Sequence, residues 1–176
     1  MDVEIVAAGD AEYPIVINLA RFYMYDMAEH GGWPFEPNGD FDVGDTFDPY
    51  WGRPRASRAW PGDWQGLPFL ACIDGHPAGF ALVVRMNEAS PRYDMGEFFV
   101  ARQYRRHGAG RRMATALFDR FAGEWIIRQL LTNRAAHTFW RRIIADYTGG
   151  KFTETQEHFA EYGGKEFIVQ RFDSRH

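Results

Sequence analysis

A junction of strand, glycine loop and helix near the middle of the chain constrains the fold more than any other feature. The apolar run 95–101 leads into Arg105-Arg106-His107-Gly108-Ala109-Gly110, and Met113, Leu117 and Phe118 then follow at helical spacing. Glycines let the backbone approach a ligand, and the free N–H groups at a helix start attract anions. The junction predicts alternating strands and helices, with either a phosphate site or a tight turn at the loop.

The remaining periodicity predicts further elements on both sides of this junction. A helix after Asp10 as N-cap has Ile15, Leu19, Phe22, Tyr23 and Met27 on its apolar face, and another helix follows Asn133. The segment Asp74-Gly75-His76-Pro77 is typical of a hairpin. We expect strands at 3–7, 69–73, 78–85, 95–101, 125–131, 152–159 and 167–172. The pattern predicts helices on both faces of a mixed sheet.

Length and charge limit the class of protein. The 176 residues fit one domain, 1–176, and the net charge of -4 argues against a general nucleic-acid binder. No apolar run is long enough to span a membrane, and the first residues lack the pattern of a signal peptide, so we expect a cytoplasmic protein. The lone Cys72 is expected to be a buried apolar residue, and no metal site is expected.

The segment 30–68 has no clear period and is rich in Gly, Pro, Trp and Asp. We expect it to contain a short helix or to act as a lid on the substrate side. Between Glu36 and Asp48 it carries five acids and no base, and these acids either attract a cationic amine or are simply solvated. The acids are Glu36, Asp40, Asp42, Asp45 and Asp48.

Two motifs resemble those of the GNAT acyltransferase superfamily. The loop 105–110 is similar to the Arg/Gln-x-x-Gly-x-Gly/Ala signature of that family, and it follows a strand that ends at Val100. Asn133, Ala136, Phe139 and Trp140 are similar to its Asn-x-x-Ala-x-x-hydrophobic-aromatic segment. The resemblance covers 69–152 well and omits 30–68. It implies a three-layer αβα fold, α/β (α+β), with a mixed, mostly antiparallel sheet of about seven strands whose fourth and fifth strands diverge where Val100 ends.

The resemblance also implies acetyl-CoA as cosubstrate and an amine as acceptor, a small molecule or a peptide. The backbone of Phe98, Phe99 and Val100 is expected to meet the pantetheine arm, with the N–H near Val100 serving as oxyanion donor. The segment from Arg106 to Arg111 is expected to wrap the pyrophosphate. Asn133 is expected either to bond the pantetheine or to cap its helix, and Trp140 to line the cofactor channel. The full cofactor set is Phe98, Phe99, Val100, Arg105, Arg106, His107, Gly108, Ala109, Gly110, Arg111, Asn133 and Trp140.

Catalytic roles are less constrained by the resemblance. Glu97 is the candidate base for deprotonating a primary amine, with an outward-facing strand residue as the alternative. Trp140 stands where much of the family has an acidic Tyr, and Arg128 where some members have a base. Tyr147 is therefore the candidate acid, with Tyr23, Tyr25 or water as alternatives. Other classes stay open, namely a non-catalytic acyl-CoA-binding regulator or an interaction module, and the protein is expected to be a monomer or homodimer.

Overall fold

The computed structural model describes residues 2–39, 43–55, 60, 63–86 and 92–175. Within these residues, seven strands form one sheet in the order β1-β2-β3-β4-β5-β7-β6, in which only β4 and β5 are parallel neighbours. The strands are β1 Val3–Ala7, β2 Trp64–Ile73, β3 His76–Met86, β4 Arg92–Val100, β5 Glu124–Leu130, β6 Thr153–Phe159 and β7 Lys165–Asp173. The helices are α1 Tyr13–Gly31, α2 Ala109–Arg120 and α3 Arg134–Thr148, with 3-10 turns η1 Asp48–Trp51, η2 Arg102–Tyr104 and η3 Ala160–Tyr162.

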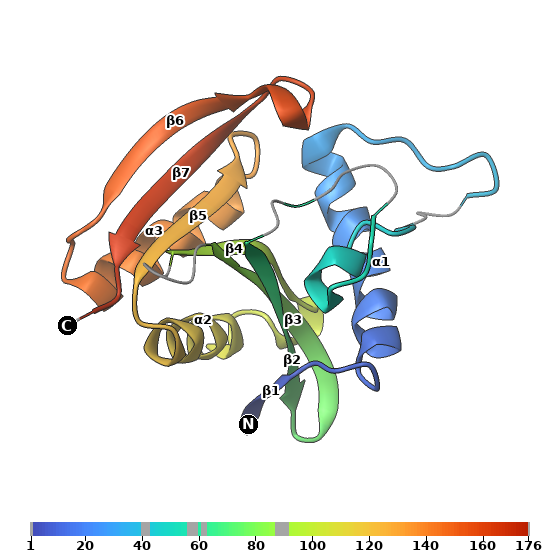
Figure 1. The fold of residues 1–176 in the computed structure, drawn as a ribbon, viewed down its shortest axis with the longest axis horizontal. Coiled ribbons are helices and arrows are strands. Elements are labelled where there is room, and N and C mark those ends of the chain that lie inside the picture. Colours follow the sequence, from blue (N-terminus) through green and yellow to red (C-terminus); the bar gives the residue numbers. More distant parts are fainter. Residues whose placement is uncertain (1, 40–42, 56–59, 61–62, 87–91, 176) are drawn as a thin grey trace.

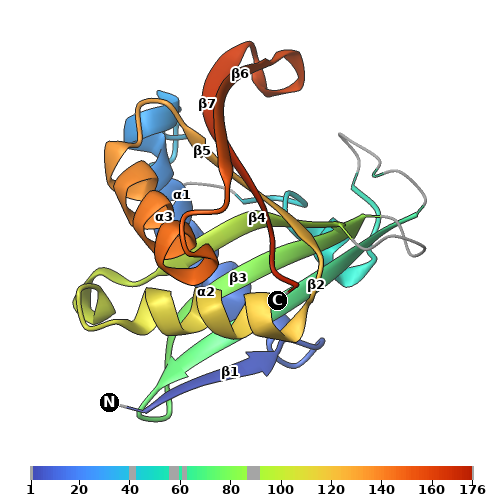
Figure 2. The same cartoon turned by 90° about the vertical axis from the view of Figure 1, so that its left-hand side faces the viewer.

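Helices cover both faces of the sheet, as the sequence predicts. Figure 2 shows α2 in front of the strands and α1 behind them. The core is split accordingly, with α2 and α3 packed on a cluster that includes Met113, Trp125 and Ile144, and α1 on a second cluster that includes Val16 and Phe80. The mixed sheet between two helical layers confirms the expected three-layer αβα architecture.

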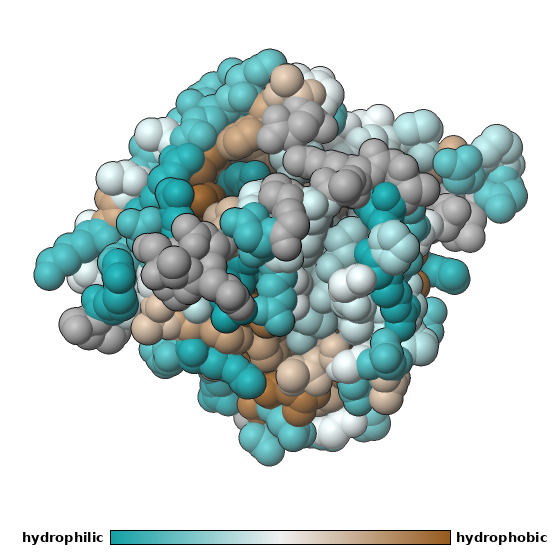
Figure 3. Space-filling view, in the orientation of Figure 1, coloured by the Kyte–Doolittle hydropathy of each residue, from teal (hydrophilic) through white to brown (hydrophobic). Residues whose placement is uncertain are grey.

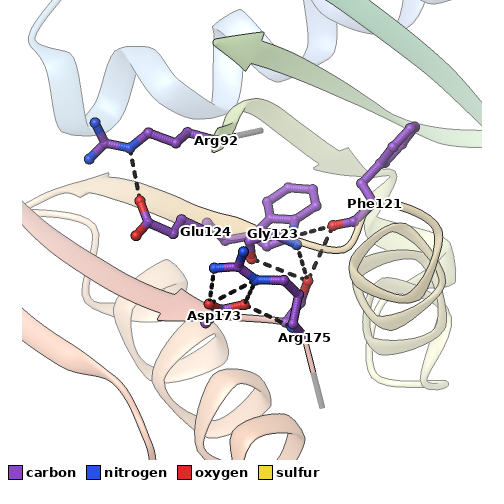
Figure 4. A network of polar contacts seen from close by, with 8 residues as sticks. Arg92, Phe121, Gly123, Glu124, Asp173 and Arg175 are labelled. Carbon is purple, nitrogen blue, oxygen red and sulfur yellow. Dashed lines mark hydrogen bonds and ion pairs between the residues drawn. The ribbon is translucent and has the colours of Figure 1, made fainter. Parts of the chain in front are cut away.

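The parallel strands β4 and β5 pair only at their starts. The register joins 92–95 to 124–127 and goes no further, so 96–100 has β3 on one side and lacks β5 on the other. Figure 1 shows the two halves of the sheet parting above this point. At the closed end Arg92 pairs with Glu124 at 3.0 Å, and the Ser174 hydroxyl accepts from the N–H of Gly123 (Figure 4). The divergence therefore begins after Met95, five residues before the predicted point at Val100.

The hairpin between β2 and β3 is confirmed. Its two turn residues, Asp74 and Gly75, have φ of 49° and 79°. Positive φ at both central positions is the pattern of the type I′ turn, whose twist matches that of paired strands.

The start and the inner face of α1 differ from the prediction. The helix begins at Tyr13 with Glu12 as N-cap, whereas Asp10 lies outside it and pairs with Arg53. The predicted face is also rotated, because Phe22 is 64% exposed while Val16 and Ala20 are fully buried. Periodicity alone does not separate these two stripes, since both carry apolar residues at helical spacing.

The segment 30–68 contributes to the core, and it contains the expected short helical turn, η1. Phe47 and Tyr50 are buried beside β3, and the Tyr13 hydroxyl donates to Asp48. A Cβ at Gly66 would lie 2.3 Å from the Tyr50 backbone, so this glycine allows η1 to rest directly on β2. Strand β2 consequently begins at Trp64, five residues before the predicted start.

The surface is largely hydrophilic on the face drawn in Figure 3, with apolar residues showing beneath the β6–β7 hairpin and low in the view near β1. Among the described residues, none of the helices combines the length and the apolar character needed to cross a bilayer.

Candidate active site

A β-bulge in β4 builds the candidate site. Leu82 of β3 stands opposite Glu97 and Val83 stands opposite Met95, so that Gly96 is one extra residue in β4. Residues three apart in a regular strand point to opposite faces, but the bulge brings Asp94 and Glu97 to the same face. Both carboxylates therefore line one pocket at the point where β4 leaves β5.

Gly96 makes the bulge possible because of its neighbour Tyr50. A Cβ at Gly96 would lie 2.1 Å from the Tyr50 hydroxyl oxygen and 3.2 Å from the carbonyl oxygen of Leu82. These distances leave no room for a side chain, so glycine is required where η1 contacts β4.

Glu97 lies at the pocket wall with its carboxylate bound to α1. The Tyr23 hydroxyl donates to Oε2 of Glu97 at 2.5 Å. Burial raises the pKa of Glu97 to about 7, and the carboxylate of Asp94 adds to this rise. The Tyr23 hydrogen bond and the charges of Arg128 and Arg55 act in the opposite direction. A carboxylate with a pKa close to neutral is suited to accept a proton from an amine.

Asp94 and Arg128 form a buried ion pair beside Glu97. Nη2 of Arg128 donates to Oδ2 of Asp94, whereas Oδ1 of Asp94 is buried without a hydrogen-bond partner. Burial raises the pKa of Asp94, and the guanidinium of Arg128 opposes that rise. The Arg128 guanidinium also lies 5.5 Å from the ring centroid of Phe159 and 5.8 Å from that of Tyr162. Arg128, which stands where the resemblance implies a base in some members, is here a cation held by Asp94.

The pocket has a volume of about 320 Å³, and its walls contain both aromatic and charged side chains. Aromatic side chains from α1, η1 and β2 line it together with the charged side chains, and Trp60 packs edge-on against Tyr50 at 4.8 Å between ring centroids. The walls include Tyr23, Trp33, Phe47, Tyr50, Trp60, Trp64 and Tyr162. Sequence reasoning identified Glu97 but missed Asp94, Tyr50 and Arg55, although Gly96 inside a strand pattern is a signal of a bulge.

The glycine loop lies where the sequence predicts it, between β4 and α2. Arg106 and Gly108 have φ of 67° and 82°, and Gly108 precedes the first residue of α2 without any side chain to cap it. Arg106 and His107 are exposed beside the helix start, whose N–H groups and dipole favour an anion. A Cβ on Gly110 would lie 3.1 Å from the Phe139 ring, so this glycine also permits α2 to pack on α3. The loop thus has the glycines, the exposed cationic side chain and the free helix start on which the prediction of a phosphate site depends.

Two arginines of the predicted cofactor set have protein partners. Arg105 donates from Nε to the Val100 carbonyl at 2.6 Å and pairs with Asp26 of α1 at 2.5 Å. Arg111 pairs with Asp146 of α3 at 2.6 Å. Arg105 therefore fixes the end of β4 to α1, a structural role that sequence reasoning did not assign to it.

The residues of the second motif, Asn133 to Trp140, mainly make contacts within the protein. The Asn133 side chain accepts from the N–H of Ala136 at 3.0 Å, which confirms the helix-capping interpretation. Trp140 is 5% exposed and packs edge-on against Phe98 at 4.7 Å. Phe98 and Val100 face this α2–α3 side, whereas Phe99 faces the α1 side with the pocket. Glu97 and Val100 thus leave opposite faces of β4, as strand alternation predicts.

The tyrosines considered as acids lie in three different places. Tyr147 donates to Asp119 of α2 at 2.8 Å and packs on Phe118, away from the residues that line the pocket. Burial raises its pKa, and Asp119 adds to the rise. Tyr25 is exposed on α1, whereas Tyr23 contacts Glu97 directly. Of these three tyrosines, only Tyr23 lies at the pocket.

Comparison with models of known protein families shows the family to which the chain belongs. The family model "Acetyltransferase (GNAT) family" matches residues 33–144, more than half of the chain. The chain therefore belongs to the GNAT acetyltransferase family, and this membership supports acetyl transfer from acetyl-CoA. No curated protein matches the chain in sequence.

Solved structures share the fold at low sequence identity. A probable acetyltransferase from Staphylococcus epidermidis has a TM-score of 0.65 at 12% identity, covering 99% of this chain and 100% of its own. The ribosomal-protein-S18-alanine N-acetyltransferase from Escherichia coli has a TM-score of 0.58 at 16% identity, covering 99% of this chain and 96% of its own. Arabidopsis thaliana Naa50, in complex with the bisubstrate analogue CoA-Ac-MVNAL, has a TM-score of 0.60 at 12% identity, covering 98% of this chain and 99% of its own. At these identities the likeness shows the fold alone.

Proposed function

We propose that the protein transfers the acetyl group of acetyl-CoA to a primary amine, with Glu97 as the base. The observation that carries this proposal is the position of Glu97 in the pocket at the opening of the sheet, together with its pKa of about 7. An alkyl amine is mostly protonated near neutral pH, so a base must remove a proton before attack. A carboxylate that is half ionised near pH 7 can accept this proton.

The reaction proceeds by direct attack in this proposal. The ammonium group gives one proton to Glu97, directly or through water, and the neutral nitrogen forms a bond to the thioester carbonyl carbon. The carbon–sulfur bond then breaks, the nitrogen, which is positively charged after the attack, loses its second proton, and the leaving coenzyme A thiolate takes up one proton to become the thiol. The backbone at Val100 is the proposed oxyanion donor, and Arg106, His107, Gly108, Ala109 and Gly110 are proposed to hold the pyrophosphate.

Tyr23 is proposed as a positioning residue for Glu97. Its hydroxyl holds one carboxylate oxygen, and this bond lowers the pKa of Glu97 against the effect of burial. Burial raises the pKa of Tyr23 itself well above its usual value, with Glu97 adding to the rise, so Tyr23 stays protonated and can keep donating. Tyr147 is not retained as the acid, because its hydroxyl is bound to Asp119.

The proposal is tested by product analysis. Purified protein is incubated with acetyl-CoA and a panel of primary amines that includes amino acids, polyamines, aminoglycosides and peptides with free N-termini. Thiol release and the mass of the acceptor are followed together. We expect at least one amine to become N-acetylated in step with thiol release. Binding of acetyl-CoA without turnover of any amine would instead support the non-catalytic alternative.

A further inference from the structure

Residues 96–100 of β4 border the opening in the sheet, and the proposed chemistry depends on both ends of this segment. Glu97 is the proposed base, and the backbone at Val100 is the proposed oxyanion donor. Strand β3 lies on one side of the segment, whereas the register of β5 stops at Met95. The open side of a strand has no ladder hydrogen bonds, so contacts from outside the sheet decide where Val100 lies relative to Glu97.

Asp26 of α1 makes such a contact through Arg105. Nη2 of Arg105 lies 2.5 Å from Oδ2 of Asp26, and Nε of the same guanidinium donates to the carbonyl oxygen of Val100 at 2.6 Å. The Arg105 guanidinium also lies 5.6 Å from the ring centroid of Phe99. One arginine thus joins an acid of the helix to the backbone at the end of β4.

Arg102 holds the other carboxylate oxygen of Asp26. Both Nε and Nη2 of Arg102 donate to Oδ1 of Asp26, at 3.2 Å and 2.7 Å. Although burial raises the pKa of Asp26, hydrogen bonds from Arg105 and Arg102 outweigh burial and hold this pKa below its ordinary value. Asp26 therefore stays ionised throughout the neutral pH range, and its link to Arg105 does not titrate there.

Tyr23 and Asp26 lie three residues apart on α1 and hold the two ends of the segment. The Tyr23 hydroxyl binds Glu97, and Asp26 reaches Val100 through Arg105. Residues three apart on a helix share a face, so one face of α1 makes both contacts. The base and the proposed oxyanion donor are thus attached to the same helix.

The C-terminal end of α1 is attached to the opposite side of the opening. The carbonyl oxygens of His30 and Gly31 accept hydrogen bonds from the Thr132 hydroxyl and from Nζ of Lys165, at 3.1 Å and 2.7 Å. Thr132 follows β5, and Lys165 is the first residue of β7. The last carbonyls of a helix lack partners within it, so these donors satisfy them. Helix α1 is therefore bound to both sides of the opening.

The acids of the segment 30–68 make no comparable contact where they are described. Asp48 accepts from Tyr13, Asp45 lies 3.7 Å from Arg55, Glu36 is exposed, and Asp40 and Asp42 lie outside the described residues.

Resting on the function proposed above, we propose that Asp26 is a positioning residue for acetyl transfer. It does not line the pocket and acts through Arg105, which holds the Val100 backbone in place while Tyr23 holds Glu97. The arrangement assigns the Arg105 side chain to Asp26 and the strand, and not to the pyrophosphate. A misplacement of reacting groups by about 1 Å can cost about 10²-fold in rate, so the attachment matters for turnover.

Asp26→Asn tests this role, because the amide keeps the shape of the side chain and loses its charge. We expect kcat, with an acceptor found in the amine panel, to fall about 10-fold or more. The Kd for acetyl-CoA should stay the same or tighten, since the cofactor is an anion and the nearby arginines lose their acid. The acidic limb of kcat/KM should not move, because Asp26 does not titrate there. Glu29→Gln, at an exposed acid three residues further along α1, is the matched control and should keep full kcat.

A second pair of variants tests the route through Arg105. Arg105→Gln should lower kcat as much as Asp26→Asn does, and the double variant should lose no more than either single variant, because both changes break one link. Arg102→Gln removes a partner of Asp26 without touching the strand and should keep most of the kcat. A weaker Kd for acetyl-CoA in Arg105→Gln would place this arginine on the pyrophosphate and overturn the inference.

Hydrogen exchange tests the attachment without turnover. In Asp26→Asn the amides of 96–101 should exchange about 10-fold faster or more than in wild type, whereas Glu29→Gln should leave them unchanged. Equal exchange in wild type and Asp26→Asn would overturn the inference whether or not an acceptor is found. A wild-type protein that acetylates no amine would overturn the proposed function, whereas an active wild type with unchanged kcat in Asp26→Asn would overturn this inference alone.

Discussion

Tyr23 and Glu97 are 74 residues apart in the chain, and a hydrogen bond of 2.5 Å joins them in the lining of the pocket. This bond ties α1 to the bulged segment of β4 and lowers the pKa of a carboxylate that burial raises to about 7. The position and the basicity of the proposed base thus depend on a residue from another layer of the fold.

Tyr23→Phe should shift the pH profile of acetyl transfer. Loss of the hydroxyl removes a bond to the ionised carboxylate, so the pKa of Glu97 rises further. A base must be ionised to act, and the acidic limb of kcat/KM should therefore move to higher pH, with a lower rate at pH 7. Tyr25→Phe, on the exposed side of the same helix, should leave the limb in place. An unchanged limb in Tyr23→Phe would show that this bond does not set the pKa of Glu97.

The stability of the fold should also depend on Glu97 and pH. The folded-state pKa of about 7 lies above the ordinary value of 4.5, so the neutral carboxyl is favoured in the fold. The contribution of the neutral Glu97 carboxyl to the stability of the fold is fully present below pH 4.5 and is lost as the pH rises through 7. Each pKa unit is worth about 1.4 kcal/mol, so the change is on the order of 3 kcal/mol. Glu97→Gln should unfold at a higher denaturant concentration than wild type at pH 8, and this advantage should shrink toward pH 4.5.

Gly96→Ala should disturb the bulge. The new methyl group would meet the Tyr50 hydroxyl oxygen at 2.1 Å, and overpacking of this kind typically destabilises by about 1–3 kcal/mol. Tyr50→Phe removes the oxygen that is closest, so the double variant should lose less stability than the sum of the two single variants. Strict additivity in urea unfolding would show that the two residues are not in contact as described.

The glycine loop should determine the affinity for acetyl-CoA. Gly108→Val puts a branched side chain at a φ of 82° and closes the space beside the start of α2. Arg106→Ala removes one charge-assisted contact, worth roughly 1.5–3 kcal/mol or about 10-fold to 100-fold in Kd. Arg120→Ala, at the far end of α2, is the control. Calorimetry that finds the same Kd in wild type and both loop variants would exclude the loop as the pyrophosphate site.

Much of the fold could be predicted from local pattern. The turn at Asp74 and Gly75, the junction before α2 and the cap at Asn133 depend on neighbouring residues, and all three are present in the structure. The inner face of α1 could not be predicted, because Val16 and Phe22 fit a helical stripe equally well until β3 and η1 decide which side is buried.

The candidate site was only partly accessible in the sequence. Glu97 was predicted because it lies on the strand where some members of the family have a carboxylate, but the shared face of Asp94 and Glu97 depends on the bulge at Gly96. The pocket is also lined by Tyr23, Tyr50 and Arg55. These residues come together through contacts between segments far apart in the chain, and no local sequence pattern predicts such contacts. Tyr147, chosen from its helix alone, lies against Asp119 instead.

The most direct test of the account is the rate of Glu97→Gln at saturating acetyl-CoA and acceptor. The amide keeps the shape of the carboxylate and cannot take the proton from the ammonium group. We expect kcat to fall by about 10²-fold or more, with the Kd for acetyl-CoA unchanged and the pH optimum moved upward, where more of the amine is already neutral. A variant that keeps nearly full turnover from about pH 6 to pH 9 would contradict the assignment of Glu97 as the base.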